Sequence, residues 1–143
     1  MEAIAWLTHK YVMHGPFWSI HRDHHQPDKS SFFERNDLFF ILFALPGIAL
    51  IYFGFINPAY EHLLMVGIGI SAYGIAYLLV HDLIIHQRLR ILSQSKNIYI
   101  AGLRRAHRLH HKHTGKYHGE CFGMLFVPIH VWQDILKRKK IYK

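Results

Sequence analysis

The sequence predicts an all-α protein, an integral membrane helical bundle built around a transmembrane hairpin. Three observations support this prediction. Two long apolar runs occupy the middle of the chain, all 17 basic residues lie outside these runs, and most of the 14 histidines lie on either side of them. With 143 residues, of which 51% are hydrophobic, the chain is expected to form a single domain over residues 1–143.

The two apolar runs have the length and composition of transmembrane helices. Residues 38–56 are uncharged and would form a helix about 28 Å long, which matches the hydrocarbon core of roughly 30 Å. Asn57 and Pro58 end this run, and residues 63–80 form a second one, rich in small residues that let helices pack closely in lipid. A buried hairpin in a soluble protein is the alternative, but it would need more polar sequence around it than this chain supplies.

The basic residues set the expected topology. No Lys or Arg occurs between residues 38 and 87, including the turn that joins the two runs. Because cytoplasmic loops carry an excess of Lys and Arg, both ends of the hairpin are expected on the cytoplasmic side of the cell inner membrane. The formal net charge of +8 is then a sign of membrane topology, so we expect membrane lipid as a partner and no nucleic acid.

Ten of the 14 histidines follow one pattern that occurs twice, over residues 9–25 and 81–111. Each copy has a pair spaced His-x4-His, followed by a His-x2-His-His triplet. The ten residues are His9, His14, His21, His24, His25, His81, His86, His107, His110 and His111. A paired motif repeated in so short a chain indicates a multinuclear metal site, whereas single histidines are usually surface or capping residues.

Helical spacing suggests how these histidines meet. Positions i, i+3 and i+4 lie within about 100° of one another, so each triplet can present three imidazoles to one point. Positions i and i+5 lie about 140° apart on an ideal helix. The two members of each pair, His9 with His14 and His81 with His86, are therefore expected to serve different metals or to lie where a helix frays.

The donor set limits the metal. Neutral imidazole suits iron, zinc, copper or nickel, whereas magnesium and calcium prefer oxygen. Ten imidazoles are too many for one ion and suit two, so the predicted fold class includes a cytoplasmic histidine-rich dimetal site. Heme binding and metal storage are the alternatives.

Several other site types are excluded. Cys121 is the single cysteine, which rules out an intramolecular disulfide and a Cys-x-x-Cys site. Neither Glu-x-x-His nor His-Glu-x-x-His occurs, so a carboxylate-bridged di-iron bundle and a zinc peptidase of that type are unsupported. An all-imidazole pair of irons that is open to dioxygen suits attack on an unactivated C–H bond, with substrate arriving from lipid beside the site.

The order of the histidines resembles the fatty acid hydroxylase superfamily of membrane di-iron oxygenases. The short sequence motifs around these histidines resemble the bacterial β-carotene hydroxylase family. The resemblance covers essentially the whole chain. It rests on HKYVMHG at 9–15, FERNDL at 33–38, AYG at 72–74, VHD at 80–82, HQR at 86–88, AHRLHH at 106–111, CFG at 121–123 and Pro128.

The resemblance implies a four-helix membrane fold with two non-heme iron ions held by the ten motif histidines. It implies a monooxygenase that hydroxylates carbon 3 of β-ionone rings, taking β-carotene through β-cryptoxanthin to zeaxanthin with O2 and electrons from a ferredoxin-type donor. Catalytic roles are expected for His81, Asp82 and His86, with Asp82 orienting the His81 imidazole. Family members carry a longer apolar segment before the first motif; only eight residues precede His9 here, so we expect the first membrane helix to be truncated.

Two alternatives remain beside this interpretation. One is an oxygenase of the same superfamily acting on a sterol or a fatty acyl chain. The other is a membrane metal-binding or heme-binding protein without catalysis. The residues leave open which metal is bound, whether keto-carotenoids are accepted, which protein donates electrons, and the oligomeric state.

Overall fold

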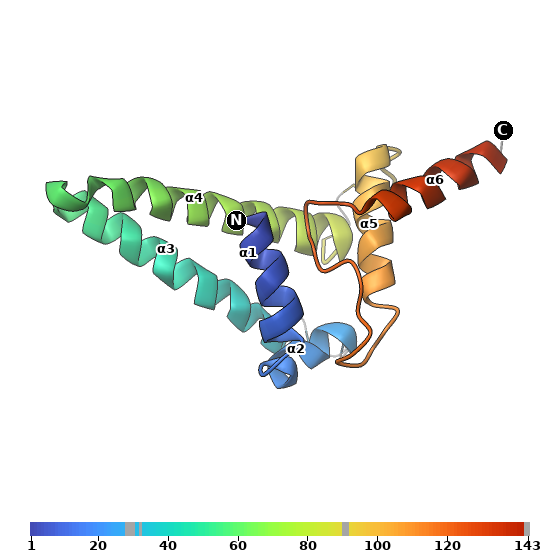
Figure 1. The fold of residues 1–143 in the computed structure, drawn as a ribbon, viewed down its shortest axis with the longest axis horizontal. Helices are drawn as coiled ribbons and strands as arrows, with labels where there is room; N and C mark the ends of the chain where they lie inside the picture. The colour runs from blue at the N-terminus through green and yellow to red at the C-terminus, as the bar shows by residue number, and fades with distance from the viewer. Residues whose placement is uncertain (28–30, 32, 90–91, 142–143) are drawn as a thin grey trace.

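The computed structural model describes residues 1–27, 31, 33–89 and 92–141. Within these ranges every regular element is helical, which confirms the all-α prediction (Figure 1). The elements are α1 (Glu2–Leu7), η1 (Thr8–Met13), α2 (Trp18–His25), η2 (Arg35–Asp37), α3 (Leu38–Ile56), η3 (Pro58–Tyr60), α4 (Glu61–Tyr77), η4 (Leu78–Ile85), α5 (Ile98–His110) and α6 (Ile129–Ile141).

A long hairpin of α3 and α4 dominates the molecule. The bounds of α3 agree with the predicted apolar run, and Asn57 ends it, its side chain accepting a hydrogen bond from the backbone N–H of Ala59. With their flanking turns, the two arms run over Arg35–Ile56 and Pro58–Ile85, and both are long and apolar enough to cross a membrane. Only 17% and 6% of their most apolar stretches are buried. The arms therefore present apolar side chains outward, unlike the core helices of a soluble protein.

The two arms approach most closely at glycine. A Cβ added to Gly67 would lie 2.7 Å from the carbonyl oxygen of Gly47 and 2.7 Å from the backbone nitrogen of Ile51. Gly69, by contrast, would meet nothing within 4 Å. Close packing of the two arms therefore requires a glycine at position 67 in the second apolar run.

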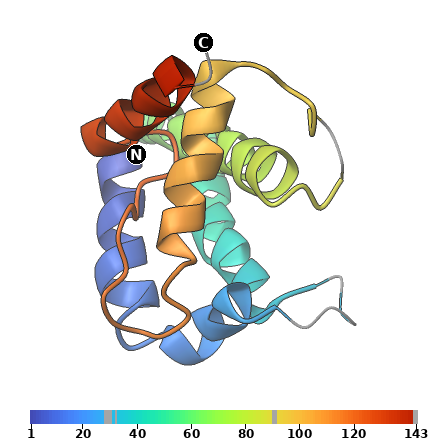
Figure 2. The ribbon, with the colours of Figure 1, turned by 90° about the vertical axis from the view of Figure 1, so that its right-hand side faces the viewer.

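The other helices close the open end of the hairpin. Figure 1 shows α1 crossing from α4 toward α3, with α2 beyond it, and Figure 2 shows α5 lying across the end. Helix α6 packs on α5, where the Trp132 ring covers Gly102 so closely that a Cβ there would lie 2.8 Å from it. A small buried core joins these two helices to the segment before α6, made of Leu103, Ala106, Val127 and Val131.

Glu2 ties three separate parts of the chain together. One carboxylate oxygen accepts hydrogen bonds from three successive backbone N–H groups, those of residues 124–126, at 2.8, 2.9 and 3.1 Å. The other accepts from the Tyr73 hydroxyl at 2.6 Å. Charge-assisted bonds of this kind are about twice as strong as neutral ones, so α1, α4 and the segment between α5 and α6 are held in one arrangement.

Candidate metal centre

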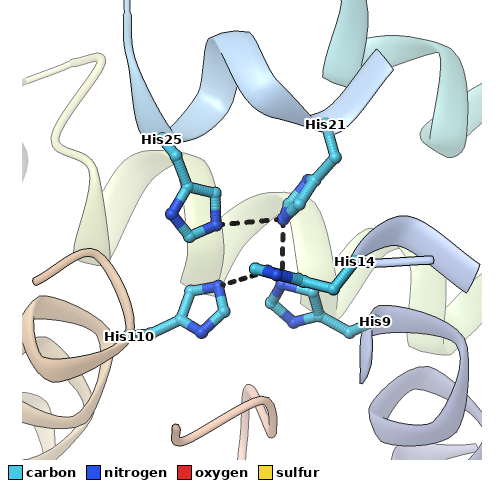
Figure 3. A group of neighbouring side chains, drawn as sticks. All are labelled: His9, His14, His21, His25 and His110. Atoms are coloured by element: carbon cyan, nitrogen blue, oxygen red, sulfur yellow. Dashed lines mark hydrogen bonds between the residues drawn. The ribbon is translucent and has the colours of Figure 1, made fainter. Parts of the chain in front are cut away.

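The ten predicted histidines gather at the open end of the hairpin in two groups. Within each group, one ligand atom of every side chain lies within 4.8 Å of the others. Cluster one comprises His9, His14, His21, His25 and His110, and cluster two comprises His24, His81, His86 and His107. His111 adjoins cluster two, because its Nε2 lies 3.2 Å from that of His24. In Figure 3 the imidazoles of cluster one converge from three different parts of the chain.

Each His-x4-His pair lies on a π-helical turn, η1 or η4. The backbone N–H of His14 donates to the carbonyl of His9 at 3.0 Å, and that of His86 donates to His81 at 2.9 Å. These bonds span five residues and close a wider turn than an α-helix does, so both members of a pair face one side. The expectation that the members serve different metals is therefore wrong, since each pair lies within one cluster. The alternative, a position at a helix end, fits better, because His14 and His86 directly follow the last residues of η1 and η4.

The His-x2-His-His triplets are divided between the clusters. The middle histidine of each triplet, His24 or His110, lies in the cluster that contains the histidines of the other motif copy. The expectation that a triplet meets at one point is wrong, because positions i+3 and i+4 diverge by about 100° around the helix. With His111 counted beside cluster two, each cluster thus combines the pair and the outer two triplet members of one motif copy with the middle member of the other copy.

Hydrogen bonds at Nδ1 determine the tautomers in cluster one. The Nδ1 atoms of four histidines donate to backbone carbonyl oxygens at 2.9 to 3.1 Å. The pairs are His9 with Phe122, His14 with Lys116, His25 with His113, and His110 with Glu120. A carbonyl oxygen can only accept, so the proton of each neutral ring lies on Nδ1 and the Nε2 lone pair is free.

The free Nε2 atoms face one another. His21, whose Nδ1 donates to Asn36 Oδ1 at 2.6 Å, has its Nε2 at 3.1 Å from that of His9 and 3.2 Å from that of His25. His14 and His110 approach in the same way at 3.4 Å (dashed lines in Figure 3). Two lone pairs at such distances repel each other, and a cation among them replaces that repulsion by coordination. The donor set of cluster one therefore fits a first-row transition metal.

Carboxylates orient two histidines of cluster two. His24 Nδ1 donates to Glu34 Oε2 at 2.8 Å, and His81 Nδ1 donates to Asp82 Oδ1 at 2.7 Å. Such partners fix the tautomer of a metal-binding imidazole and raise its basicity. Burial raises the pKa of Glu34 to about 7, although the nearby Arg88 guanidinium acts in the opposite direction.

Burial keeps nine of the ten motif histidines neutral. It lowers the pKa of His86 and His110 to about 2 and that of His21 and His111 to about 3, and neighbouring imidazoles lower these pKa values further. Metal ligation requires the unprotonated ring. At neutral pH these nine rings are therefore already in the protonation state that a metal needs.

Two sets of orienting groups were not predicted. Glu34 and Asn36 lie in the FERNDL segment, where they formed part of the resemblance but received no role at the metal site. The backbone carbonyls between residues 113 and 122 leave no trace in the sequence, because any residue type supplies a carbonyl. The histidine at 113 contributes through this backbone oxygen.

An apolar pocket between α1, α3 and α4 leads to both clusters. Its inner end is lined by His9 of cluster one and by His81 and His107 of cluster two. Its walls include Ala5, Met13, Phe39, Phe43, Ile70, Tyr73, Gly74 and Tyr77. Phe40 and Leu78 also line it while remaining 44% and 40% exposed, so the pocket reaches the apolar outer surface of the hairpin.

The residues with predicted catalytic roles lie at this inner end. His81 and Asp82 line the pocket, and the Tyr77 ring stacks on the His81 imidazole with ring centres 4.8 Å apart. His86 lies beside them in cluster two, with its Nε2 2.7 Å from that of His107.

The chain is similar in sequence to several proteins named as β-carotene hydroxylases. A β-carotene hydroxylase from Pantoea ananas is 43% identical over 128 residues, covering 90% of this chain and 71% of that protein. One from Pseudescherichia vulneris is 42% identical over 126 residues, covering 88% and 70%. The chloroplastic β-carotene 3-hydroxylase 2 of Arabidopsis thaliana is 34% identical and covers 99% of this chain, which spans half of the plant protein.

No solved structure matches the chain significantly. The model of one protein family, described as fatty acid hydroxylase, matches residues 1–136. The similarity to the β-carotene hydroxylases extends over the same region, which confirms the resemblance predicted from the histidine motifs. The chain belongs to the fatty acid hydroxylase family.

Proposed function

We propose that this protein is a β-carotene 3-hydroxylase, a monooxygenase that converts β-carotene through β-cryptoxanthin to zeaxanthin. The observation that carries the proposal is an apolar pocket that opens on the hairpin surface and ends at histidines of both clusters. The similarity to named β-carotene hydroxylases supports the choice of substrate. At each ring one C–H bond becomes C–OH, and the second oxygen atom of O2 leaves as water, formed with two electrons from the donor and two protons from solvent.

Two iron ions are the proposed cofactors, one at each cluster. The facing Nε2 lone pairs and the neutral imidazoles fit such ions. Bound there, iron would supply the dioxygen chemistry, drawing electrons from a donor of the ferredoxin type. The ten motif histidines, His9, His14, His21, His24, His25, His81, His86, His107, His110 and His111, are the proposed ligands.

The pocket positions the ring and excludes water. Phe39, Phe43 and Ile70 offer apolar walls for a β-ionone ring and the adjoining polyene. His81 and His107 are buried at the inner end, only 3% and 8% exposed. A ring held there would present its edge to both clusters, while the rest of the carotenoid would extend toward the lipid.

Asp82 is the proposed positioning residue at this end. Its carboxylate accepts a hydrogen bond from His81 Nδ1 at an N···O distance of 2.7 Å, which keeps the Nε2 lone pair of that ring available. His86 follows directly after the π-helical turn η4, which places its imidazole beside that of His107.

We infer that the hairpin spans the cell inner membrane with the histidines on the cytoplasmic side. The exposed apolar surface of the two arms supports insertion. The absence of Lys and Arg between residues 38 and 87 supports the orientation, because basic residues favour the cytoplasmic side.

Pigment analysis tests the proposal. The chain is expressed in a bacterial host that accumulates β-carotene, and the carotenoids are separated and weighed by mass spectrometry. Products heavier by one and by two oxygen atoms, the second with the retention of zeaxanthin, are expected. The His110→Ala variant, present in the membrane at the same level, should make neither. Unchanged carotene beside intact membrane-bound protein would instead favour a sterol or acyl-chain oxygenase, and a heme spectrum would favour a non-catalytic role.

A further inference from the structure

The two clusters use the same ligand type but differ in what holds their imidazoles. In cluster one, four Nδ1 protons go to backbone carbonyls and the fifth goes to the side-chain amide of Asn36. All five partners are neutral. The metal position in cluster one is therefore surrounded by neutral rings oriented by neutral groups.

Two imidazoles of cluster two are oriented by carboxyl groups instead. His24 and His81 donate their Nδ1 protons to Glu34 and Asp82. The two carboxylates are themselves mostly buried, with side chains 18% and 13% exposed. Little water separates them from the histidines, so their charge acts on the cluster through a medium of low dielectric constant.

Arg88 joins both carboxylates to the start of α3. Its guanidinium pairs with Asp37 through two hydrogen bonds, at 2.7 and 3.2 Å. It also lies 3.6 Å from Glu34 and 3.5 Å from Asp82. Three carboxylates thus share this one cation, and the closest contact belongs to Asp37, the one that touches no histidine in the described hydrogen bonds. The negative charge next to cluster two is only partly compensated.

We propose that the two metal positions are inequivalent, and that cluster two binds its divalent metal more tightly because Glu34 and Asp82 act on it through His24 and His81. A carboxylate that accepts the Nδ1 proton makes the imidazole a stronger donor at Nε2, and loss of such a partner typically costs 10- to 100-fold in metal affinity. The inference rests on the proposed dimetal function. It assigns Glu34 and Asp82 as positioning residues. It predicts that the two metal positions bind their ions in two separate steps.

Metal titration of the whole protein tests this inference. Metal-free protein in detergent is titrated at pH 8 with Co²⁺, whose absorption bands report imidazole coordination, and with Fe²⁺ under anaerobic conditions. Two binding steps separated by at least tenfold are expected. Asp82→Asn and Glu34→Gln should each weaken the tighter step by about 10- to 100-fold and leave the other step unchanged. Two equal steps, or a loss shared by both steps, would overturn the inference.

A gain-of-affinity variant and a matched control sharpen the result. Asn36→Asp places a carboxylate on His21 in cluster one, so it should tighten the weaker step and bring the two steps together. Asp23→Asn removes a carboxylate beside His24 that accepts from the backbone of Arg35, and both steps should remain as in the parent. A tighter step that weakens as much in Asp23→Asn as in Asp82→Asn would overturn the assignment.

Failure here is distinguishable from failure of the proposed function. A protein that makes zeaxanthin but binds two ions equally would refute inequivalence alone. A protein that binds in two steps but leaves β-carotene unchanged would refute the substrate alone.

Discussion

Filling the pocket at Gly74 should block substrate without disturbing the metal centre. Gly74 lines the pocket, and a Cβ added there would meet nothing within 4 Å, so a Leu side chain at this position starts in open space and is expected to occupy the room that the substrate needs. A β-ionone ring has about the apolar area of an aromatic side chain, roughly 150 Å². At about 25 cal/mol per Å², full exclusion of the ring would remove about 4 kcal/mol of binding. If all of this binding free energy is lost in the transition state, kcat/KM falls by about a thousandfold.

Gly69→Leu is the matched control for Gly74→Leu. Gly69 lies on the same helix, is exposed, and would also meet nothing within 4 Å. Turnover of β-carotene by membranes containing each variant is measured together with the metal content of the purified protein. We expect both variants to hold the parent's metal content and only Gly74→Leu to lose turnover. Turnover of Gly74→Leu within threefold of the control would refute the placement of the substrate.

Three further perturbations follow from the geometry. His110→Ala should remove the ion of cluster one and abolish hydroxylation while the protein stays in the membrane, as measured by metal analysis of the purified variant. Gly67→Ala should destabilise the hairpin by about 1–3 kcal/mol through overpacking, relative to Gly69→Ala, in a denaturing-detergent titration; equal midpoints would contradict the packing at Gly67. Lowering the pH from 8 to 5 should destabilise the metal-free protein. The folded state holds the pKa of His86 and His110 near 2, well below the ordinary 6.5. The unfolded chain therefore binds protons that the folded chain rejects, at about 1 kcal/mol per group for each pH unit below 6.5; an unfolding midpoint that is flat over this range would contradict the buried, neutral rings.

Local patterns in the sequence predicted the hairpin and the gathering of the histidines. The uncharged run from 38 to 56 coincides with α3, because nothing in it favours water and Asn57-Pro58 stops the helix. The histidines meet because a hairpin returns the chain to the side where it began, which brings η1 and α2 next to η4 and α5.

The grouping of the ligands was beyond a prediction from ideal helices. At 100° per residue, His9 and His14 appear on different faces. The chain instead forms a π-helical turn there, and the extra residue in the turn brings both imidazoles to one side. The residues between His9 and His14 carry no pattern that predicts a π-helical turn.

The backbone carbonyls that accept from the histidine Nδ1 atoms could not be predicted from the sequence either. Phe122 and Glu120 act through backbone oxygens, and their positions follow from the path of the segment between α5 and α6. That path depends in turn on long-range contacts such as the Glu2 carboxylate with the backbone of residues 124–126. Such contacts join residues more than a hundred positions apart, where helical spacing carries no information.

We propose that the ten histidines form two metal positions at the end of a substrate pocket. The most direct test is the iron content per chain of protein purified anaerobically from cells grown with iron, measured for the parent and for His110→Ala. We expect two iron ions per chain in the parent, one or fewer in the variant, and no heme absorption in either. A parent with a single iron, or with an iron content that the variant retains, would contradict the dimetal centre.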